Sequence, residues 1–175
     1  MMRQIEYPFP RDDEVRRVWP FALVPEEIKT SSLALTAYHE AGHVVLLEWV
    51  GFDVKQAVAA KGEGATLFDR PSERATAVGI VSPNEAHHAG AAALAHAGIC
   101  AELIYAGAPW QGVTKRNDSD WQLAHDMLFP IFGGSSAGHG YAQRVALSVL
   151  TQNWGRVVQI AGELMKSGSW KPPCS

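Results

Sequence analysis

The sequence predicts a mainly helical α+β domain in which a small β-sheet flanks a central helix bearing a His-Glu-Ala-Gly-His motif. Apolar residues recur at helical spacing in several long segments, whereas short runs of small and β-branched residues lie between two of them. The chain has 175 residues, of which 47% are hydrophobic, and one domain usually takes about 100–200 residues. These observations indicate one helical core with a minor sheet.

The N-terminal segment is interrupted by prolines at positions 8, 10, 20 and 25. Proline lacks a backbone N–H and interrupts regular structure. We therefore expect residues 1–30 to form an extended N-terminal arm, with at most a brief helical turn around Asp13–Val18. Residues 31–175 are expected to form the folded domain.

The clearest helix runs from Ser32 to Val50 and is apolar on nearly every side, so we expect it at the centre of the domain. Ser32 is an N-cap candidate and Gly51 is the residue type that ends helices. After it, the segments 52–61 and 75–81 are expected to form two or three short strands, separated by turns at 62–64 and 69–71.

Three further helices are expected in the second half of the chain. The first begins at Ser82-Pro83-Asn84-Glu85, a capping-box pattern, and ends near Ala106. The second begins at Asn117-Asp118-Ser119 and is expected to end before Pro130. After a glycine-rich loop over 133–138, one long helix is predicted from Ala142 to Lys166.

Composition excludes several classes of protein. The formal net charge is −3 and the sequence pI is near 6.1, which argues against nucleic-acid binding and against a polybasic membrane anchor. Two distant cysteines give no disulfide framework. We expect no secretory leader, no membrane span and a cytoplasmic location.

The chemistry is concentrated in His39-Glu40-Ala41-Gly42-His43. The i, i+4 spacing places both imidazoles on one helix face, within reach of a single Zn²⁺ ion. Glu40, which does not bind the metal, is expected to act as the proton acceptor for an attacking water. Gly42 costs about 1 kcal/mol relative to alanine in a helix, so we expect another element to pack closely against it.

Three segments resemble the peptidase domain of the FtsH-type ATP-dependent zinc proteases. They are Ala37–His43, which is similar to that family's AYHEAGH segment, Gly98–Gly107 and Val113–Ala124. The resemblance spans about residues 34–166 and implies a zincin-like peptidase domain whose third zinc ligand is Asp120. The loop Lys115–Ser119 and Ile99 depart from the family pattern. No phosphate-binding loop is present in the sequence, so we expect this chain to lack the ATPase domain of that family.

A second carboxylate competes for a role at the site. Glu102 lies in the middle of an apolar helix, where it is either solvent-exposed, a partner that orients a ligating histidine, or an alternative ligand. Asp120 is preferred as the ligand because it lies in the first turn of its helix, directly after the capping residues.

The sequence thus predicts a zinc-dependent endopeptidase that cleaves unfolded or flexible polypeptides without ATP. Its substrate is expected to lie along an edge strand, 52–61 or 77–81. Two alternatives stay open: a regulatory peptidase resembling ImmA-type proteins with one repressor substrate, and a zinc-binding interaction module without turnover. A homo-oligomer or an ATPase partner in trans is also possible.

Overall fold

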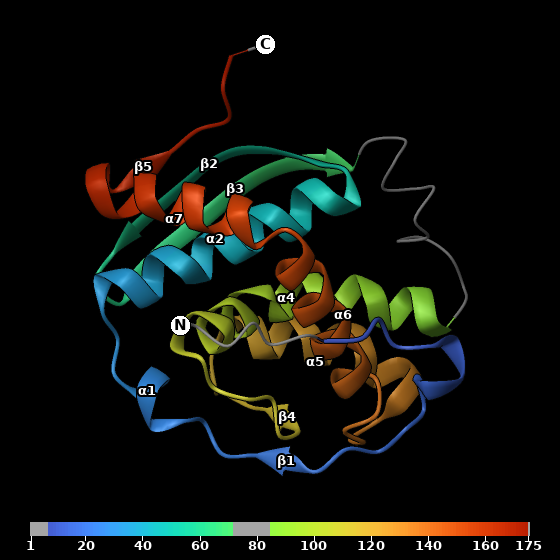
Figure 1. Cartoon of the computed structure of the whole chain (residues 1–175). Helices are drawn as coiled ribbons and strands as arrows, with labels where there is room; N and C mark the ends of the chain where they lie inside the picture. The colour runs from blue at the N-terminus through green and yellow to red at the C-terminus, as the bar shows by residue number, and fades with distance from the viewer. Residues whose placement is uncertain (1–6, 72–84, 175) are drawn as a thin grey trace.

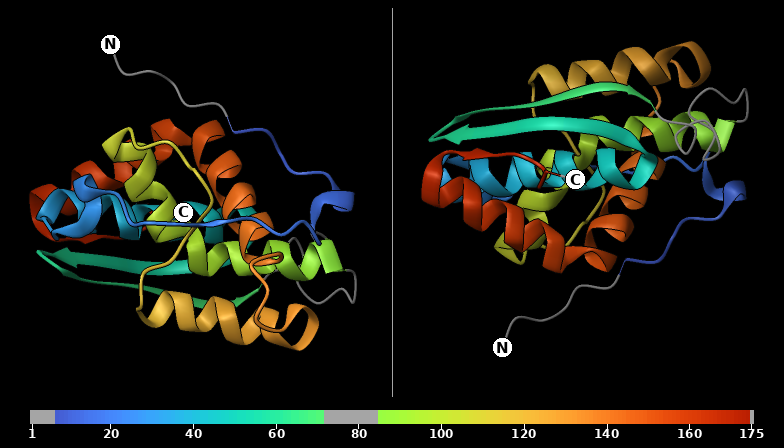
Figure 2. Two further views of the ribbon diagram at one scale, coloured as in Figure 1. Left: turned by 90° about the horizontal axis from the view of Figure 1, so that it is seen from below. Right: turned by 90° about the horizontal axis from the view of Figure 1, so that it is seen from above.

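The computed structural model describes residues 7–71 and 85–174 and has the predicted α+β class. The long helix α2, Leu33–Val50, runs through the middle of the molecule (Figure 1). The helices α4, Glu85–Ala106, and α7, Trp154–Ser167, contact it, and so does the three-stranded sheet. Figure 2 shows the sheet lying along α2 with helix α5, Ser119–Phe132, beyond it.

Helix α2 begins and ends where the sequence predicts. The Ser32 side chain accepts a hydrogen bond from the Leu35 backbone N–H at 3.1 Å. At the other end Gly51 adopts a φ of 105°, and its N–H donates to Leu47. This left-handed backbone conformation is one that glycine adopts without strain, and it ends the helix at Gly51. The side chains of Val44 and Leu46 are fully buried, which agrees with a central position.

The main sheet has the strand order β3-β2-β5, with β2 covering Phe52–Ala60, β3 Glu63–Pro71 and β5 Ser169–Trp170. The strands β2 and β3 form an antiparallel hairpin with the register Ala57↔Thr66. The expected turn at 69–71 is wrong, because this segment continues β3 in pairing with β2. The expected strand at 75–81 and the capping box at 82–84 lie outside the described residues.

The strand 52–61 was also expected as a possible edge strand for substrate. This is wrong, because β2 lies in the middle of the sheet and pairs with β3 on one side and β5 on the other. Within the described residues β3 is the edge strand on the side of α2 that carries the motif.

Helix α4 packs against α2 through small residues. A Cβ placed on Gly42 would lie 2.7 Å from the Ala97 carbonyl oxygen and 2.7 Å from the Ala101 Cβ, so only glycine permits this approach. The expectation of a close neighbour at Gly42 is confirmed. By length and composition α4 could cross a membrane, yet 72% of its apolar window is buried inside the domain, as in a core helix of a globular protein.

The last helices differ from the expectation in two places. Helix α5 continues through Pro130 to Phe132 instead of ending before the proline. Its last turn is anchored by the buried Phe132 and by a Gly133 N–H bond to Phe129. The long helix expected at 142–166 is two helices, α6 over His139–Gln152 and α7. They break at Asn153, whose side chain also caps the Val149 carbonyl.

Over residues 7–30 the arm is mostly extended and packs against the domain; its 3-10 turn lies at Asp12–Glu14, partly overlapping the turn expected around Asp13–Val18, and a strand and a second short helix were not expected. Strand β1, Phe21–Ala22, pairs in parallel with β4, Val113–Thr114. A short helix α1, Glu26–Lys29, follows and buries Ile28. These contacts place the arm beside the loop that leads into α5.

Candidate metal centre

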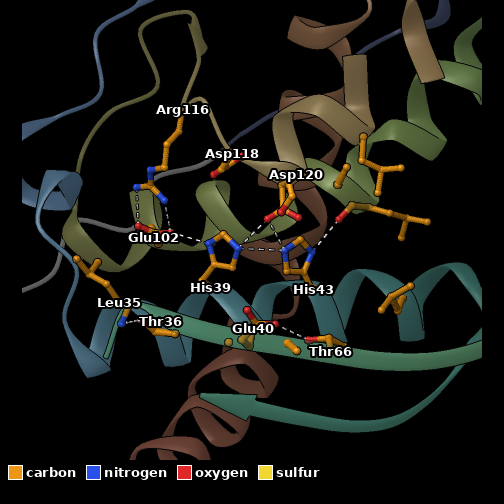
Figure 3. Close-up of a pocket in the computed structure, with 18 of the residues that line it drawn as sticks. Leu35, Thr36, His39, Glu40, His43, Thr66, Glu102, Arg116, Asp118 and Asp120 are labelled. Carbon is orange, nitrogen blue, oxygen red and sulfur yellow. Dashed lines mark hydrogen bonds and ion pairs between the residues drawn. The ribbon is translucent and has the colours of Figure 1, made fainter. Parts of the chain in front are cut away.

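His39 and His43 lie one turn apart on α2, and their rings point toward the same neighbour (Figure 3). The two Nε2 atoms are 3.2 Å apart. Both side chains are mostly buried, with 15% and 13% exposure. The helical spacing alone brings these two atoms together, as the sequence predicts.

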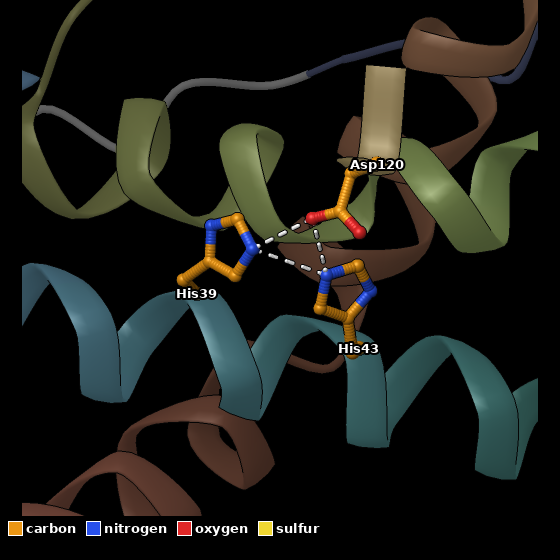
Figure 4. Close-up of side chains that lie close together, drawn as sticks. All are labelled: His39, His43 and Asp120. Atoms are coloured by element: carbon orange, nitrogen blue, oxygen red, sulfur yellow. Dashed lines mark hydrogen bonds and ion pairs between the residues drawn. The ribbon is translucent and has the colours of Figure 1, made fainter. Parts of the chain in front are cut away.

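Asp120 reaches the same point from the first turn of α5 (Figure 4). Its Oδ2 lies 2.9 Å from the His39 Nε2 and 3.1 Å from the His43 Nε2. The Asp118 carboxylate caps α5 by accepting from the Trp121 N–H at 2.9 Å. This cap starts the helix next to the histidines, so Asp120 is held at the site by a defined local structure.

The outer nitrogens of the two rings fix where their lone pairs point. The His43 Nδ1 lies 2.9 Å from the Leu94 carbonyl oxygen, so it must carry the proton and donate. The His39 Nδ1 lies 2.6 Å from Glu102 and donates in the same way. In the neutral rings both Nε2 lone pairs therefore face each other and the Asp120 carboxylate. These lone pairs and the carboxylate repel one another unless a cation lies between them.

The separations also suit a metal ion. Ligand atoms placed tetrahedrally at zinc distances are about 3.3 Å apart, close to the 2.9–3.2 Å found here. His39, His43 and Asp120 can therefore hold a metal ion. In the protein alone, burial lowers the pKa of His39, but the Asp120 and Glu102 carboxylates outweigh this effect and raise it to about 10. A proton then takes the place of the cation.

Glu102 is buried, at 4% exposure, and it touches His39 from the side away from Asp120. Arg116 donates to both of its carboxylate oxygens at 2.8 Å and to the Ile28 carbonyl at 3.0 Å. Burial opposes the charged carboxylate, but these partners outweigh it and lower the pKa of Glu102. Glu102 thus orients His39, and the structure brings Asp120, not Glu102, to the ligand position.

Arg116 is the member of the site that the sequence analysis missed. It lies in the loop Lys115–Ser119, which was noted only as a departure from the family pattern. The available signal was a lone arginine four residues before Asp120, together with a carboxylate in the middle of an apolar helix that needs a cationic partner.

Glu40 points from α2 toward the edge strand β3 (Figure 3). It is 6% exposed, and its Oε2 accepts from the Thr66 hydroxyl at 2.7 Å. A Cβ on Gly64 would lie 2.5 Å from the Glu40 Oε1, so the β3 backbone passes directly over the carboxylate. Glu40 and the three candidate ligands line one cavity of about 650 Å³.

This cavity has a mixed lining. Lys29, Ser31 and Arg116 contribute polar groups to it, and Leu47 and Phe68 are among its apolar side chains. Edge strand β3 contributes Gly64, Ala65 and Thr66 to its wall. The cavity is therefore an open cleft bordered by a strand whose outer side is unpaired within the described residues.

No protein-family model matches this chain. No curated protein and no solved structure matches it either. The residues of this cleft and their geometry are therefore the main indication of what this protein does.

Other titratable residues lie outside the centre. Cys100 is fully buried, and burial raises the pKa of its thiol, which disfavours a role as a nucleophile. His88 is half-buried and bonds to the Met127 carbonyl. His139 is buried in the first turn of α6.

Proposed function

We propose that this protein is a zinc-dependent endopeptidase acting on unfolded or flexible polypeptides. The observation that carries the proposal is the convergence of His39, His43 and Asp120 in a cleft that also holds the Glu40 carboxylate. Two imidazoles, one carboxylate and an open position form a ligand set typical of catalytic zinc. The resemblance to the FtsH-type peptidase domain supports the same assignment.

His39, His43 and Asp120 would hold the zinc, which would supply Lewis acidity toward a water and the scissile carbonyl. Glu40 then takes the proton from the water as its oxygen attacks the carbonyl carbon, and returns a proton to the nitrogen as the C–N bond breaks. Thr66 holds the Glu40 carboxylate in place. Glu102 and Arg116 hold the ring of His39, which fixes the direction of its Nε2.

The substrate class follows from the shape of the cleft. An extended polypeptide can add to the free edge of β3 through main-chain hydrogen bonds, which need little sequence preference. In a stably folded protein most extended segments are already paired with neighbouring strands, and native proteins protect the edges that remain. With no phosphate-binding loop in the sequence, cleavage by this chain should need no ATP and should spare stable folded proteins.

The test is the cleavage of an unfolded casein-type substrate together with metal analysis. The parent should contain one zinc per chain and cleave the substrate; Glu40→Gln should keep the zinc and lose at least about 100-fold in turnover. His39→Ala should lose both. Zinc binding without cleavage of any unfolded chain would instead identify a zinc-binding interaction module, and a Glu40→Gln variant as fast as the parent would remove Glu40 as the base.

A further inference from the structure

A second cavity, of about 260 Å³, lies behind the segment that carries Asp120. Successive side chains of this segment line different cavities. Lys115 and Asn117 line the second cavity, whereas Arg116 and Asp118 line the cleft of the candidate metal centre. Residues 115–118 thus form a wall between the two cavities.

One lysine, Lys115, and no carboxylate line the second cavity. Its other titratable lining groups are His125 and His139. Within the described part of the chain Lys115 has no ion pair, and its Nζ lies 5.2 Å from the centre of the Trp121 ring. An ammonium held over an aromatic face keeps N–H groups free to donate. The cavity therefore contains a cation that lacks a counter-ion among the described residues.

A buried glutamine fixes the orientation of a chain of histidines that ends at this cavity. The Gln143 Oε1 accepts from the Trp110 indole N–H at 2.9 Å and from the Thr114 N–H at 3.0 Å. Its Nε2 donates to the Thr114 carbonyl at 2.8 Å and faces the His96 Nδ1 at 3.4 Å. The amide cannot be reversed without placing its oxygen against a carbonyl, so His96 accepts at Nδ1.

The direction set by Gln143 passes along three rings. His96 must carry its proton on Nε2, which lies 3.0 Å from the His139 Nδ1. His139 therefore carries its own proton on Nε2, 3.5 Å from the His125 Nδ1. Burial lowers the pKa of His96 to about 3 and that of His139 to about 4, so both rings are neutral near pH 7.

These proton positions disfavour a second metal ion between His139 and His125, because the His139 Nε2 carries a proton and has no free lone pair for a metal. Because the His125 Nδ1 accepts from His139, the His125 Nε2 carries an N–H, and among the described residues this N–H has no hydrogen-bond partner. The end of the chain is therefore a free donor on a residue that lines the second cavity.

We propose that the second cavity is a binding site for a small oxyanion, a carboxylate or a phosphate. The Lys115 ammonium supplies the charge, and the His125 Nε2–H and the Asn117 amide supply hydrogen bonds. Charged hydrogen bonds of this kind are stronger than neutral ones. The site is separate from the candidate metal centre and does not depend on it.

The test is an NMR titration of the full chain, with ¹⁵N label, against sodium phosphate and sodium acetate at constant ionic strength. We expect saturable shifts of the His125 ring and the Trp121 indole with at least one anion; saturation with phosphate only or acetate only identifies the class. Lys115→Gln should weaken binding by about 10-fold. The control Lys166→Gln, an exposed lysine on α7, should bind as the parent does.

Two results would overturn the proposal. One is the absence of saturable binding by either anion to the parent; the other is equal affinity of the parent, Lys115→Gln and His125→Gln. The ring ¹⁵N shifts of the same sample give an independent check, since His96 and His139 should both be neutral Nε2–H tautomers. An Nδ1–H tautomer at His96 or His139 would show that the rings do not donate to one another in this order, so the His125 Nε2 would not be fixed as a donor. Neither outcome bears on peptidase activity, which is measured separately.

Discussion

Arg116 shows how one side chain can tie distant parts of this molecule to the candidate metal centre. It joins Glu102 on α4 to the Ile28 carbonyl in the N-terminal arm, and Glu102 in turn contacts His39. Removing the guanidinium leaves a buried carboxylate without its main partner. The orientation of His39 therefore depends on a residue that touches no candidate ligand directly.

We predict that Arg116→Met weakens zinc binding by about 10–100-fold, the usual cost of losing an outer partner of a ligand. Competition with a chromophoric chelator measures the affinity. The matched control is Arg156→Met, which removes the Arg156–Glu48 pair, 3.0 Å long, between α7 and α2. That variant should bind zinc as tightly as the parent. Equal affinity of Arg116→Met and the parent would show that Glu102 needs no such support.

The two carboxylates near His39 should respond differently to neutralisation. Asp120→Asn removes a charged atom that lies within 3.1 Å of both Nε2 atoms, so zinc affinity should fall by more than in Glu102→Gln. Glu102→Gln keeps the shape of the side chain that holds His39, so it should lower the zinc affinity by about 10–100-fold. Zinc titrations of both variants test this order, and a Glu102→Gln protein that loses zinc while Asp120→Asn keeps it would reverse the assignment.

At the scale of elements, the contact between α2 and α4 depends on Gly42. Glycine to alanine normally stabilises a helix by about 1 kcal/mol, but here the new methyl would overlap the Ala97 carbonyl and the Ala101 side chain. We predict that Gly42→Ala lowers the free energy of unfolding by about 1–3 kcal/mol through overpacking. Urea denaturation followed by circular dichroism measures the change.

Gly162 on α7 is the control for this prediction, since a Cβ placed there meets nothing within 4 Å. Gly162→Ala should stabilise the protein by about 0.5–1 kcal/mol. If both variants shift the unfolding midpoint in the same direction, the close packing at Gly42 does not determine the effect of Gly42→Ala on stability.

The elements that the sequence predicted correctly have strong local signals, and the errors have a physical reason. Ser32 and Gly51 define the ends of α2 by their own hydrogen bonds. The break at Asn153 was missed because α6 is buried on nearly every side and α7 along one face, so apolar residues recur at helical spacing on both sides of the break. The end of β3 was missed because its pairing with β2 outweighs the turn preference of Asp69-Arg70-Pro71.

At the scale of the whole molecule, a bound metal should couple to global stability. The three candidate ligands come from α2 and α5, which are distant in sequence. A ligand that binds only the folded state stabilises it by about 2.7 kcal/mol at 100 times its Kd. We therefore predict that zinc raises the melting temperature by about 5–10 °C and that a chelator reverses this.

Differential scanning calorimetry tests the coupling, with His43→Ala as the control. That variant lacks one ligand and should melt at the same temperature with or without zinc. A parent protein whose melting temperature ignores both zinc and chelator would contradict a metal centre formed by these residues.

By itself the sequence determined the α+β class, the central helix and the shared face of His39 and His43. These features depend on period and capping, which act over a few residues. Only the tertiary structure brought Asp120 to both Nε2 atoms, paired Arg116 with Glu102, placed β3 over Glu40 and aligned Gln143 with three histidines. Such groups meet across 14 to 88 positions of sequence, and their contacts are set by how helices pack, which no local pattern records.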